Sequence, residues 1–307
     1  MFSTLTTING YSPIKALFLK EYWDNKRAIL VTPMVATGLF IFFAIVAMIN
    51  GTGILFDGAS MFENISQAQG FEAEAAAKIT SVLFVTLMLL VIVTGFSMVF
   101  TALSVLFDER KNKSILFWKS MPVSDTQEVL VKLATVTVVT PVVAIGFAFI
   151  IQLFAAIVVG SMITINTNLS AWNLIFSNIN YLELIAADII MAFVMILWTL
   201  PIITWFMLIS SFSRRSPFLL AFIIPILVMV IETIFFRSAL LFNAILSRID
   251  FLGEYGRKFE LAGGENVTEG VFTLIRSFSE PNFWYGIIVA IAMIAGCIQI
   301  RKRSSIA

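Results

Sequence analysis

The sequence predicts an all-α membrane protein with six transmembrane helices. Hydrophobic residues make up 59% of the chain and charged residues only 13%, whereas soluble domains carry about twice that share of charge. Uncharged apolar stretches, each long enough for the roughly 20 residues that cross a bilayer, recur along the sequence. Of the 20 Lys and Arg residues, fourteen fall on one side of the expected helices. This asymmetry is what the positive-inside rule requires.

We expect an N-terminal segment, residues 1–27, followed by a transmembrane domain over residues 28–307. The six spans are expected at about residues 28–50, 79–107, 133–160, 188–212, 216–236 and 281–300. The Lys and Arg asymmetry places both termini in the cytosol, with a cytosolic loop over 108–132 and an outer segment over 237–280. The first apolar stretch is too long for the hydrophobic part of a signal peptide, so we interpret it as an uncleaved span.

Composition excludes several classes of function. The chain has no histidine and a single cysteine, Cys297, which removes imidazole-based triads, histidine metal sites and an internal disulfide. Its net charge is +1, so no bulk charge indicates nucleic-acid binding. We therefore expect no metal, no cofactor and no catalytic activity, although a chemistry based on Ser or Asp stays formally open.

The segment 12–27 has the pattern of an amphipathic helix. Ile14, Leu17, Phe18 and Tyr22 recur at helical spacing on one face, and Pro13 suits the first helical position. Such a helix beside the first span is expected to lie in the inner headgroup layer as a membrane-surface anchor. The alternative is a specific contact with a partner.

The cytosolic loop is the most informative segment. A run of charges, residues 108–111, precedes an apolar and aromatic patch at 115–118. Pro122 prevents a helix from continuing through that point. Ser124 followed by Gln127 is a capping box, so the third span should begin as a helix at Asp125. Exposed apolar side chains rimmed by charge are typical of a docking surface for lipid or protein; an interfacial aromatic belt explains them equally well.

The string DERKNKSILFWKSMPVSD, residues 108–125, resembles the first cytoplasmic loop of bacterial ABC-2 type transporter permeases. Six spans, cytosolic termini and a long loop before the last span are also similar to that family. In the family this loop forms a coupling helix that inserts into a cleft on a separate ATPase. The resemblance therefore implies an ATPase-coupling site here. Its residues are Arg110, Lys111, Ser114, Ile115, Leu116, Phe117, Trp118 and Lys119.

The resemblance implies a type V exporter-like architecture in the bacterial cytoplasmic membrane. The chain would be a non-catalytic permease, paired with itself or with a paralogous permease and surrounded by lipid. It contains no Gly-Lys dipeptide and hence no Walker A loop, so ATP hydrolysis must come from a separate ABC ATPase subunit. The alternative is a stand-alone, nucleotide-independent transporter, or a membrane scaffold whose aromatic loop meets only lipid.

Two acidic residues, Asp188 and Glu232, fall inside spans near their outer ends. Intramembrane carboxylates are costly, which makes them candidates for an outer polar site that takes a cationic group. The alternatives are snorkelling or an ion pair between Glu232 and Arg237.

Other features of the spans indicate shape and packing. Prolines at 33, 141, 201 and 225 fall in spans one, three, four and five, where they bend helices. The pair Ala292 and Gly296 suits close helix contact in the last span. An amphipathic pattern over residues 238–251 predicts a helix in the outer segment. The resemblance to ABC-2 permeases implies that this segment helps to close the outer exit; the alternative is that it only caps the interface.

Overall fold

The computed structural model describes residues 13–49, 90–112, 123–166, 181–249, 272 and 275–303. Every regular element in these ranges is a helix. Six helices are long and apolar enough to cross a membrane, as predicted. They are Arg27–Val46, Leu90–Lys111, Asp125–Val158, Ile185–Phe212, Pro217–Phe236 and Pro281–Arg303. The chain thus has the helices of a multi-pass membrane protein.

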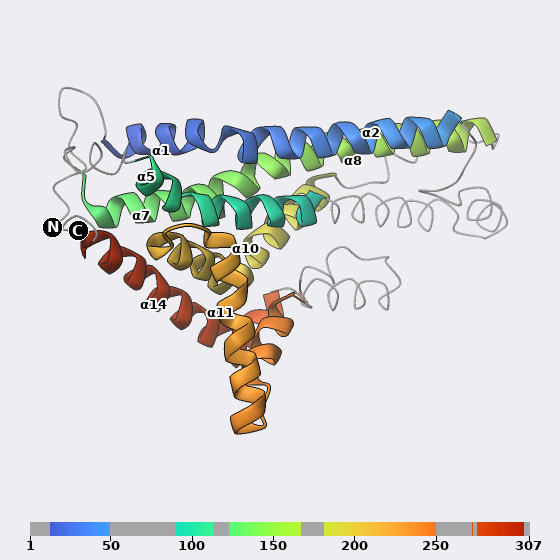
Figure 1. Cartoon of the computed structure of the whole chain (residues 1–307). Coiled ribbons are helices and arrows are strands. Elements are labelled where there is room, and N and C mark those ends of the chain that lie inside the picture. Colours follow the sequence, from blue (N-terminus) through green and yellow to red (C-terminus); the bar gives the residue numbers. More distant parts are fainter. Residues whose placement is uncertain are drawn as a thin grey trace.

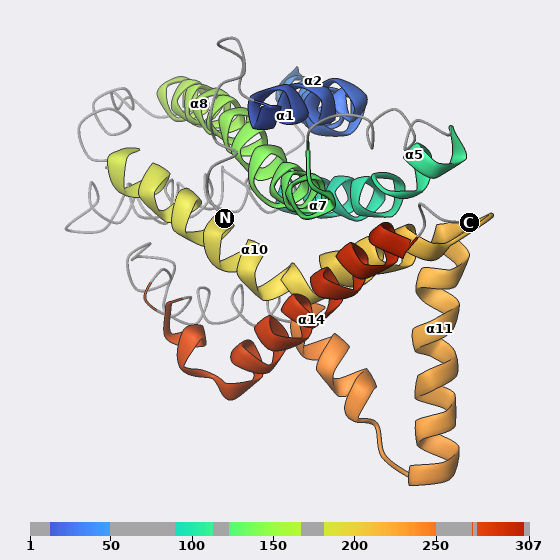
Figure 2. The same ribbon diagram turned by 90° about the vertical axis from the view of Figure 1, so that its left-hand side faces the viewer.

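Five of the spans form one bundle. Helix α2 (Thr32–Ile49) packs along α8 (Thr140–Asn166), and α10 (Tyr181–Phe212) packs against α14 (Pro281–Arg303) (Figure 1). Figure 2 shows α10 and α14 crossing beneath the first pair. A Cβ atom added at Gly296 would lie 3.1 Å from Cδ1 of Leu208. The absent side chain therefore lets α14 approach α10 closely, which confirms the packing role expected for this glycine.

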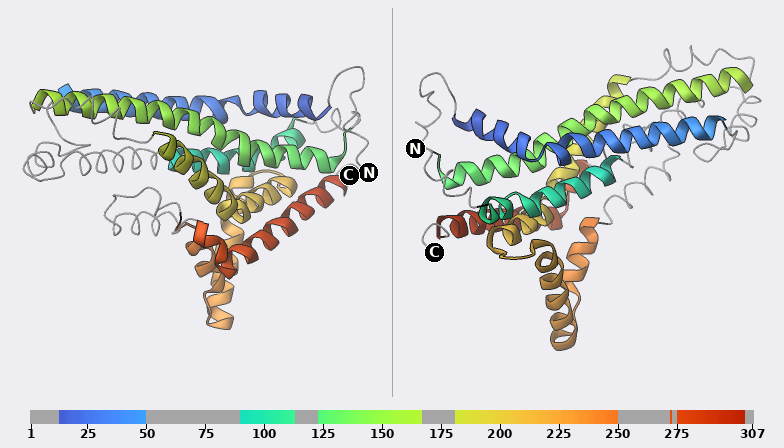
Figure 3. Two further views of the ribbon diagram at one scale, coloured as in Figure 1. Left: turned by 180° about the vertical axis from the view of Figure 1, so that it is seen from behind. Right: turned by 45° about the horizontal axis from the view of Figure 1, so that its top comes forward.

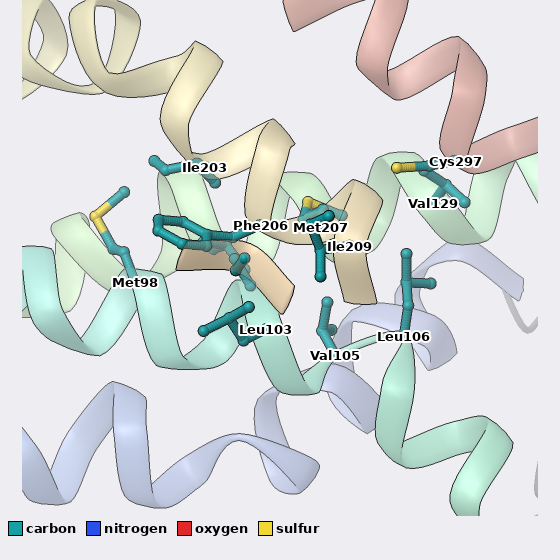
Figure 4. Packing of buried hydrophobic residues seen from close by; sticks show 13 residues of the cluster. Met98, Leu103, Val105, Leu106, Val129, Ile203, Phe206, Met207, Ile209 and Cys297 are labelled. Carbon is teal, nitrogen blue, oxygen red and sulfur yellow. The ribbon is translucent and has the colours of Figure 1, made fainter. Parts of the chain in front are cut away.

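Two apolar clusters form the core of the bundle, and α10 contributes to both. The first joins α8 and α10 through small residues such as Ala148, Ala155 and Ala187. The second joins helix 90–104, α10 and α14 with the helix Asp125–Ala134 and with Ala221 of the fifth span. Its members include Met98, Leu103, Val129, Ile203, Phe206, Met207 and Cys297 (Figure 4). Because α10 takes part in both clusters, a displacement at one end of it acts on the packing of the whole bundle.

Spans one and three each contain a π-helical segment directly before a Thr-Pro pair. The segments are η2 (Arg27–Val31), before Thr32, and η3 (Thr135–Val139), before Thr140. A proline lacks the N–H donor and crowds the carbonyl four residues earlier, and a wider turn relieves both problems. Each threonine hydroxyl donates to the carbonyl five residues back, at 3.2 Å and 3.1 Å respectively. The two Thr-Pro pairs thus account for both wide turns.

Helix α11 (Pro217–Ile231) stands away from the other spans (Figures 1 and 3). Its proline, Pro225, has no N–H to donate to the carbonyl of Ala221 four residues earlier. The indole Nε1 of Trp205, on α10, donates to that carbonyl at 3.1 Å. A side chain of the neighbouring span therefore compensates for the proline and fixes α11 to α10 at this point.

The N-terminal helix α1 (Pro13–Asp24) begins at the predicted proline. The expectation that this helix lies in the headgroup layer stays a prediction. Helix α1 runs nearly in line with α2, not across its end (Figures 1 and 2), and it packs on α7 (Asp125–Ala134). Its buried residues are Leu17 and Glu21. Leu17, on the face that we assigned to lipid, is therefore used for a contact within the protein.

Candidate functional site

Four helices converge at one end of the bundle, shown at the left of Figure 1: α1, α5 (Phe107–Lys111), α7 and α14. Charged side chains from all four meet there. We call this set the charge cluster. Its members are Lys20, Glu21, Glu109, Asp125, Glu128, Lys132 and Arg301. Charged side chains are rarely buried unless they are paired, so a buried group of this size calls for an explanation.

Glu109 is the centre of the charge cluster. Its Oε1 accepts hydrogen bonds from Lys20 and, at 2.7 Å, from Nζ of Lys132. Its Oε2 accepts from Nη1 of Arg301 at 3.0 Å. One carboxylate on α5 thereby binds α1, α7 and α14 together.

Lys132 provides the complementary link on the cationic side. It is only 1% exposed, and its Nζ also lies 2.6 Å from Oε1 of Glu21. The same Glu21 oxygen lies 2.7 Å from Nζ of Lys20. Because two lysines share the carboxylates of Glu21 and Glu109, no single pair in this part of the cluster is independent of the others.

Arg301 connects the end of α14 to the beginning of α7. Its guanidinium forms ion pairs with Glu128 and, between Nε and Oδ1 at 3.4 Å, with Asp125. A planar guanidinium with several donors suits simultaneous contact with three carboxylates. The last span is therefore fixed to the first turn of α7 as well as to Glu109.

Mutual pairing offsets the cost of burial in this cluster, as Lys20 shows. Taking an ion out of water costs several kcal/mol, about what well-placed partners return. Burial alone lowers the pKa of Lys20, but the adjoining carboxylates of Glu21 and Glu109 outweigh burial and hold that pKa above its ordinary value. Such a network gives a fixed arrangement of helices, since removal of one member leaves a buried charge uncompensated.

A break in the second span sets the direction of α5. The helix from Leu90 is interrupted at Val105 and Leu106. The backbone N–H groups of Leu106 and Phe107 donate to Oγ of Ser210 on α10, at 3.2 Å and 2.9 Å. This hydroxyl satisfies backbone donors that the interruption would leave unpaired.

Arg110 completes the attachment of α5 to α10. Its Nη2 donates to the carbonyls of Ser210 and Ser213, at 2.5 Å and 2.8 Å, and so satisfies acceptors at the end of α10. Helix α5 is therefore held on one side by α10 and on the other by the charge cluster.

The helix after the predicted coupling segment is equally well defined. Ser124 caps α7 as predicted: its side chain accepts from the backbone N–H of Gln127, and the Gln127 side chain accepts from the backbone N–H of Ser124. Among the predicted coupling residues, Arg110 and Lys111 are on α5, and Lys111 is exposed. The others, Ser114, Ile115, Leu116, Phe117, Trp118 and Lys119, lie outside the described residues.

The two acidic residues predicted for an outer polar site are in different environments. Asp188 is buried on α10, where it accepts a hydrogen bond from Gln152 of α8. Glu232 is partly exposed and accepts from Ser238 and from the backbone N–H groups of Leu240 and Leu241. Within the described ranges no hydrogen bond or ion pair joins the two carboxylates.

Glu232 therefore acts as a cap for the short helix Leu240–Ile249. The ion pair with Arg237, one of our alternatives, is not formed in the described part of the chain. Arg237 instead occupies the left-handed conformation (φ 47°) at the turn between the two helices.

The helix Leu240–Ile249 confirms the predicted amphipathic pattern over most of its length, and it carries a buried arginine that we did not predict. Arg248 is 8% exposed. Its guanidinium lies over the ring of Trp198, 4.7 Å from the centroid, and Nη1 donates to the Trp198 carbonyl at 3.0 Å. Nη2 donates to the carbonyl of Asn282. A Cβ atom at Gly286 would lie 2.2 Å from this guanidinium, so the glycine makes room for it.

Sequence reasoning missed the charge cluster because charges at span ends are usually solvated. Two signals were nevertheless present. Glu21 shares the helical face of Ile14 and Leu17, so it had to be buried with them. Glu109, Glu128, Lys132 and Arg301 also fall at the same predicted end of their spans, where opposite charges can pair.

Comparison with known protein families, characterised proteins and solved structures finds no match to this chain.

Proposed function

We propose that this chain is the membrane-spanning permease of an ABC-2 type exporter, which works in the bacterial cytoplasmic membrane with both termini in the cytosol. It moves its substrate with ATP hydrolysis performed by a separate ABC ATPase. The loop string over residues 108–125 and the six spans support this proposal. The permease itself is non-catalytic, and it pairs with a second copy or with a paralogous permease.

The observation that carries the proposal is that both flanks of residues 113–122 end in the charge cluster. Glu109 lies on the helix before this segment, and Asp125, Glu128 and Lys132 lie on the helix after it. A partner that moves the segment must therefore move α5 and α7 together. A surface loop that meets only lipid does not need such a rigid mounting.

The same contacts provide a route for displacement into the spans. In the charge cluster, Lys20 and Glu21 belong to α1, which is followed by the first span, and Arg301 belongs to the last span. Arg110 and Ser210 lead to α10. ATP-driven closure of the ATPases would thus shift the ends of several spans as one rigid unit.

The exposed apolar surface of α11 is consistent with a membrane-embedded partner or with lipid. Its side chains that are more than one-third exposed include Phe218, Leu219, Phe222, Ile223, Ile226 and Leu227. Ala221 is the only buried residue of α11. A second permease would cover part of this surface, and lipid acyl chains the remainder.

The test is affinity purification of the full-length chain from its native membranes, with the double variant Phe117→Ala/Trp118→Ala beside the wild type. We expect the wild type to co-purify an ATPase with Walker motifs and the variant to lose it, because aromatic anchors supply much of the energy of such contacts. Phe235→Ala/Phe236→Ala is the matched control: these rings are 75% and 74% exposed in the π-helical segment Glu232–Phe236 that follows α11, and the ATPase should be retained.

Two other outcomes have different meanings. An ATPase retained by the loop variant would keep the class of protein but reject the coupling role of the loop. Absence of any ATPase from the wild type, under conditions that preserve membrane complexes, would reject the proposal. The stand-alone, nucleotide-independent transporter or scaffold would then be the better account.

A further inference from the structure

Asp188 and Gln152 form a polar pair inside the apolar contact between α8 and α10. They are 3% and 1% exposed, and Nε2 of Gln152 donates to Oδ2 of Asp188 at 2.9 Å. Their neighbours on the two helices are apolar and include Ile151 and Met191. The pair is separate from the charge cluster, which lies at the end of the bundle.

Each member of this pair has one oxygen left over. Oδ1 of Asp188 and Oε1 of Gln152 are both buried, and neither has a hydrogen-bond partner among the described residues. An ionised carboxylate and an amide oxygen can only accept hydrogen bonds. Two unsatisfied acceptors in an apolar environment are strongly unfavourable, so a donor is missing from this site.

No charged side chain within the described ranges supplies that donor. Helices α2 and α8 and residues 90–104 contain no ionisable residue. On α10 itself Tyr181 and Glu183 lie within two turns before Asp188, and neither is a cation. On the remaining elements, the Arg248 guanidinium is bonded at Trp198 and Asn282, and Arg276 and Glu280 flank the short helix before α14. None of these described charges forms a hydrogen bond or ion pair with Asp188. Among the described residues, the carboxyl group of Asp188 therefore has no countercharge.

We propose that Asp188 is a proton-binding site, in which a proton on Oδ1 converts the carboxylate to a neutral acid paired with the Gln152 amide. The amide N–H donates to Oδ2, and the acid O–H donates in return to Oε1. A single proton thus removes the buried charge and satisfies both leftover oxygens. Loss of the proton requires water or a cation to reach Oδ1, so the contact between spans three and four depends on protonation. This inference goes beyond the exporter proposal and does not depend on it.

The test is infrared spectroscopy of the full-length protein in lipid nanodiscs at neutral pH. We expect the C=O stretching band of a protonated carboxylic acid, which shifts on isotope labelling of the aspartate carboxyl carbon. The band should be lost in Asp188→Asn and kept in Asp108→Asn, because Asp108 is exposed. Asp188→Asn should keep the thermal stability of the wild type, since an asparagine amide can form the same reciprocal pair with Gln152.

A second variant covers the case in which Asp188→Asn fails to fold. Gln152→Leu removes the amide, so the acid band of Asp188 should move to higher frequency as its O–H loses its acceptor. Absence of an aspartic-acid band from the wild type at neutral pH would overturn the proposal. A wild type that lacks the band and is stabilised by sodium or potassium ions would also overturn it, and would identify the site as a cation site.

Discussion

Replacement of Lys132 by methionine removes one of the three cations of the charge cluster and keeps the length of the side chain. Lys132 is almost fully buried and contacts the carboxylates of Glu21 and Glu109. After the substitution, Lys20 and Arg301 must balance the four carboxylates of the cluster. The variant therefore leaves negative charge buried without compensation.

The expected loss of stability is large. Removal of one partner from a buried ion pair costs about 3–5 kcal/mol, and we expect Lys132→Met to fall in this range. Glu109→Gln should cost less, about 1–3 kcal/mol, because three cations then face three carboxylates and the loss is mainly of hydrogen bonds. Since the two side chains are in direct contact, the double variant should cost about 0.5–3 kcal/mol less than the sum of the single variants.

The assay is denaturant unfolding of the purified full-length chain in detergent micelles, followed by tryptophan fluorescence. Lys111→Met is the matched control, because Lys111 is an exposed lysine on the same helix as Glu109. It should change the free energy of unfolding by no more than about 0.5 kcal/mol. Two results would refute the description of the cluster as one coupled unit. In the first, the double variant loses as much free energy of unfolding as the two single variants together. In the second, Lys132→Met is as stable as Lys111→Met.

The pH dependence of the cluster has a defined direction at Lys20. Its pKa is raised in the folded chain, so the protonated side chain favours folding at every pH below the ordinary lysine value of about 10.4. This contribution disappears only as the pH rises through the folded value. Lys20→Met should therefore lose the same stability, relative to wild type, at about pH 6 and about pH 9. A difference that shrinks across this window would contradict the ion pairing of Lys20.

The remaining predictions concern single hydrogen-bonded contacts between spans. Gly286→Ala places a methyl group 2.2 Å from the Arg248 guanidinium. The free energy of unfolding should therefore fall by about 1–3 kcal/mol in the same assay. An unchanged unfolding midpoint would show that Arg248 is not held there. Trp205→Phe leaves the carbonyl of Ala221 without its donor and should cost about 1–3 kcal/mol. In a Pro225→Ala background, where a backbone N–H is restored, Trp205→Phe should cost much less; an equal cost would refute the compensation.

Features set by local chemistry could be predicted from the sequence. The start of α1 at Pro13 and the capping box at Ser124 and Gln127 were correct, because a cap depends on residues within one turn of each other. The existence of six spans also follows from local hydrophobicity.

Features that depend on contacts between distant residues could not be predicted. The partners in a buried polar contact are far apart in the sequence, as are Glu21 and Lys132, or Gln152 and Asp188. From the sequence, each of these carboxylates could equally be solvated or paired with another residue. The packing of α1 on α7 could not be predicted for the same reason, since an apolar face fits a headgroup layer or another helix equally well. The capping role of Glu232 could not be predicted because two of its partners are backbone N–H groups, which no residue-type pattern identifies.

The π segments of spans one and three also determine where these two spans can change their length. A deletion of one residue within a regular α-helix rotates everything that follows by about 100°, which turns an inward face toward lipid. The segments Arg27–Val31 and Thr135–Val139 already contain wider turns, so loss of a residue there would convert a π turn to an α turn and leave the later faces in register. Tolerance of single-residue deletions should therefore be concentrated at these two positions of spans one and three.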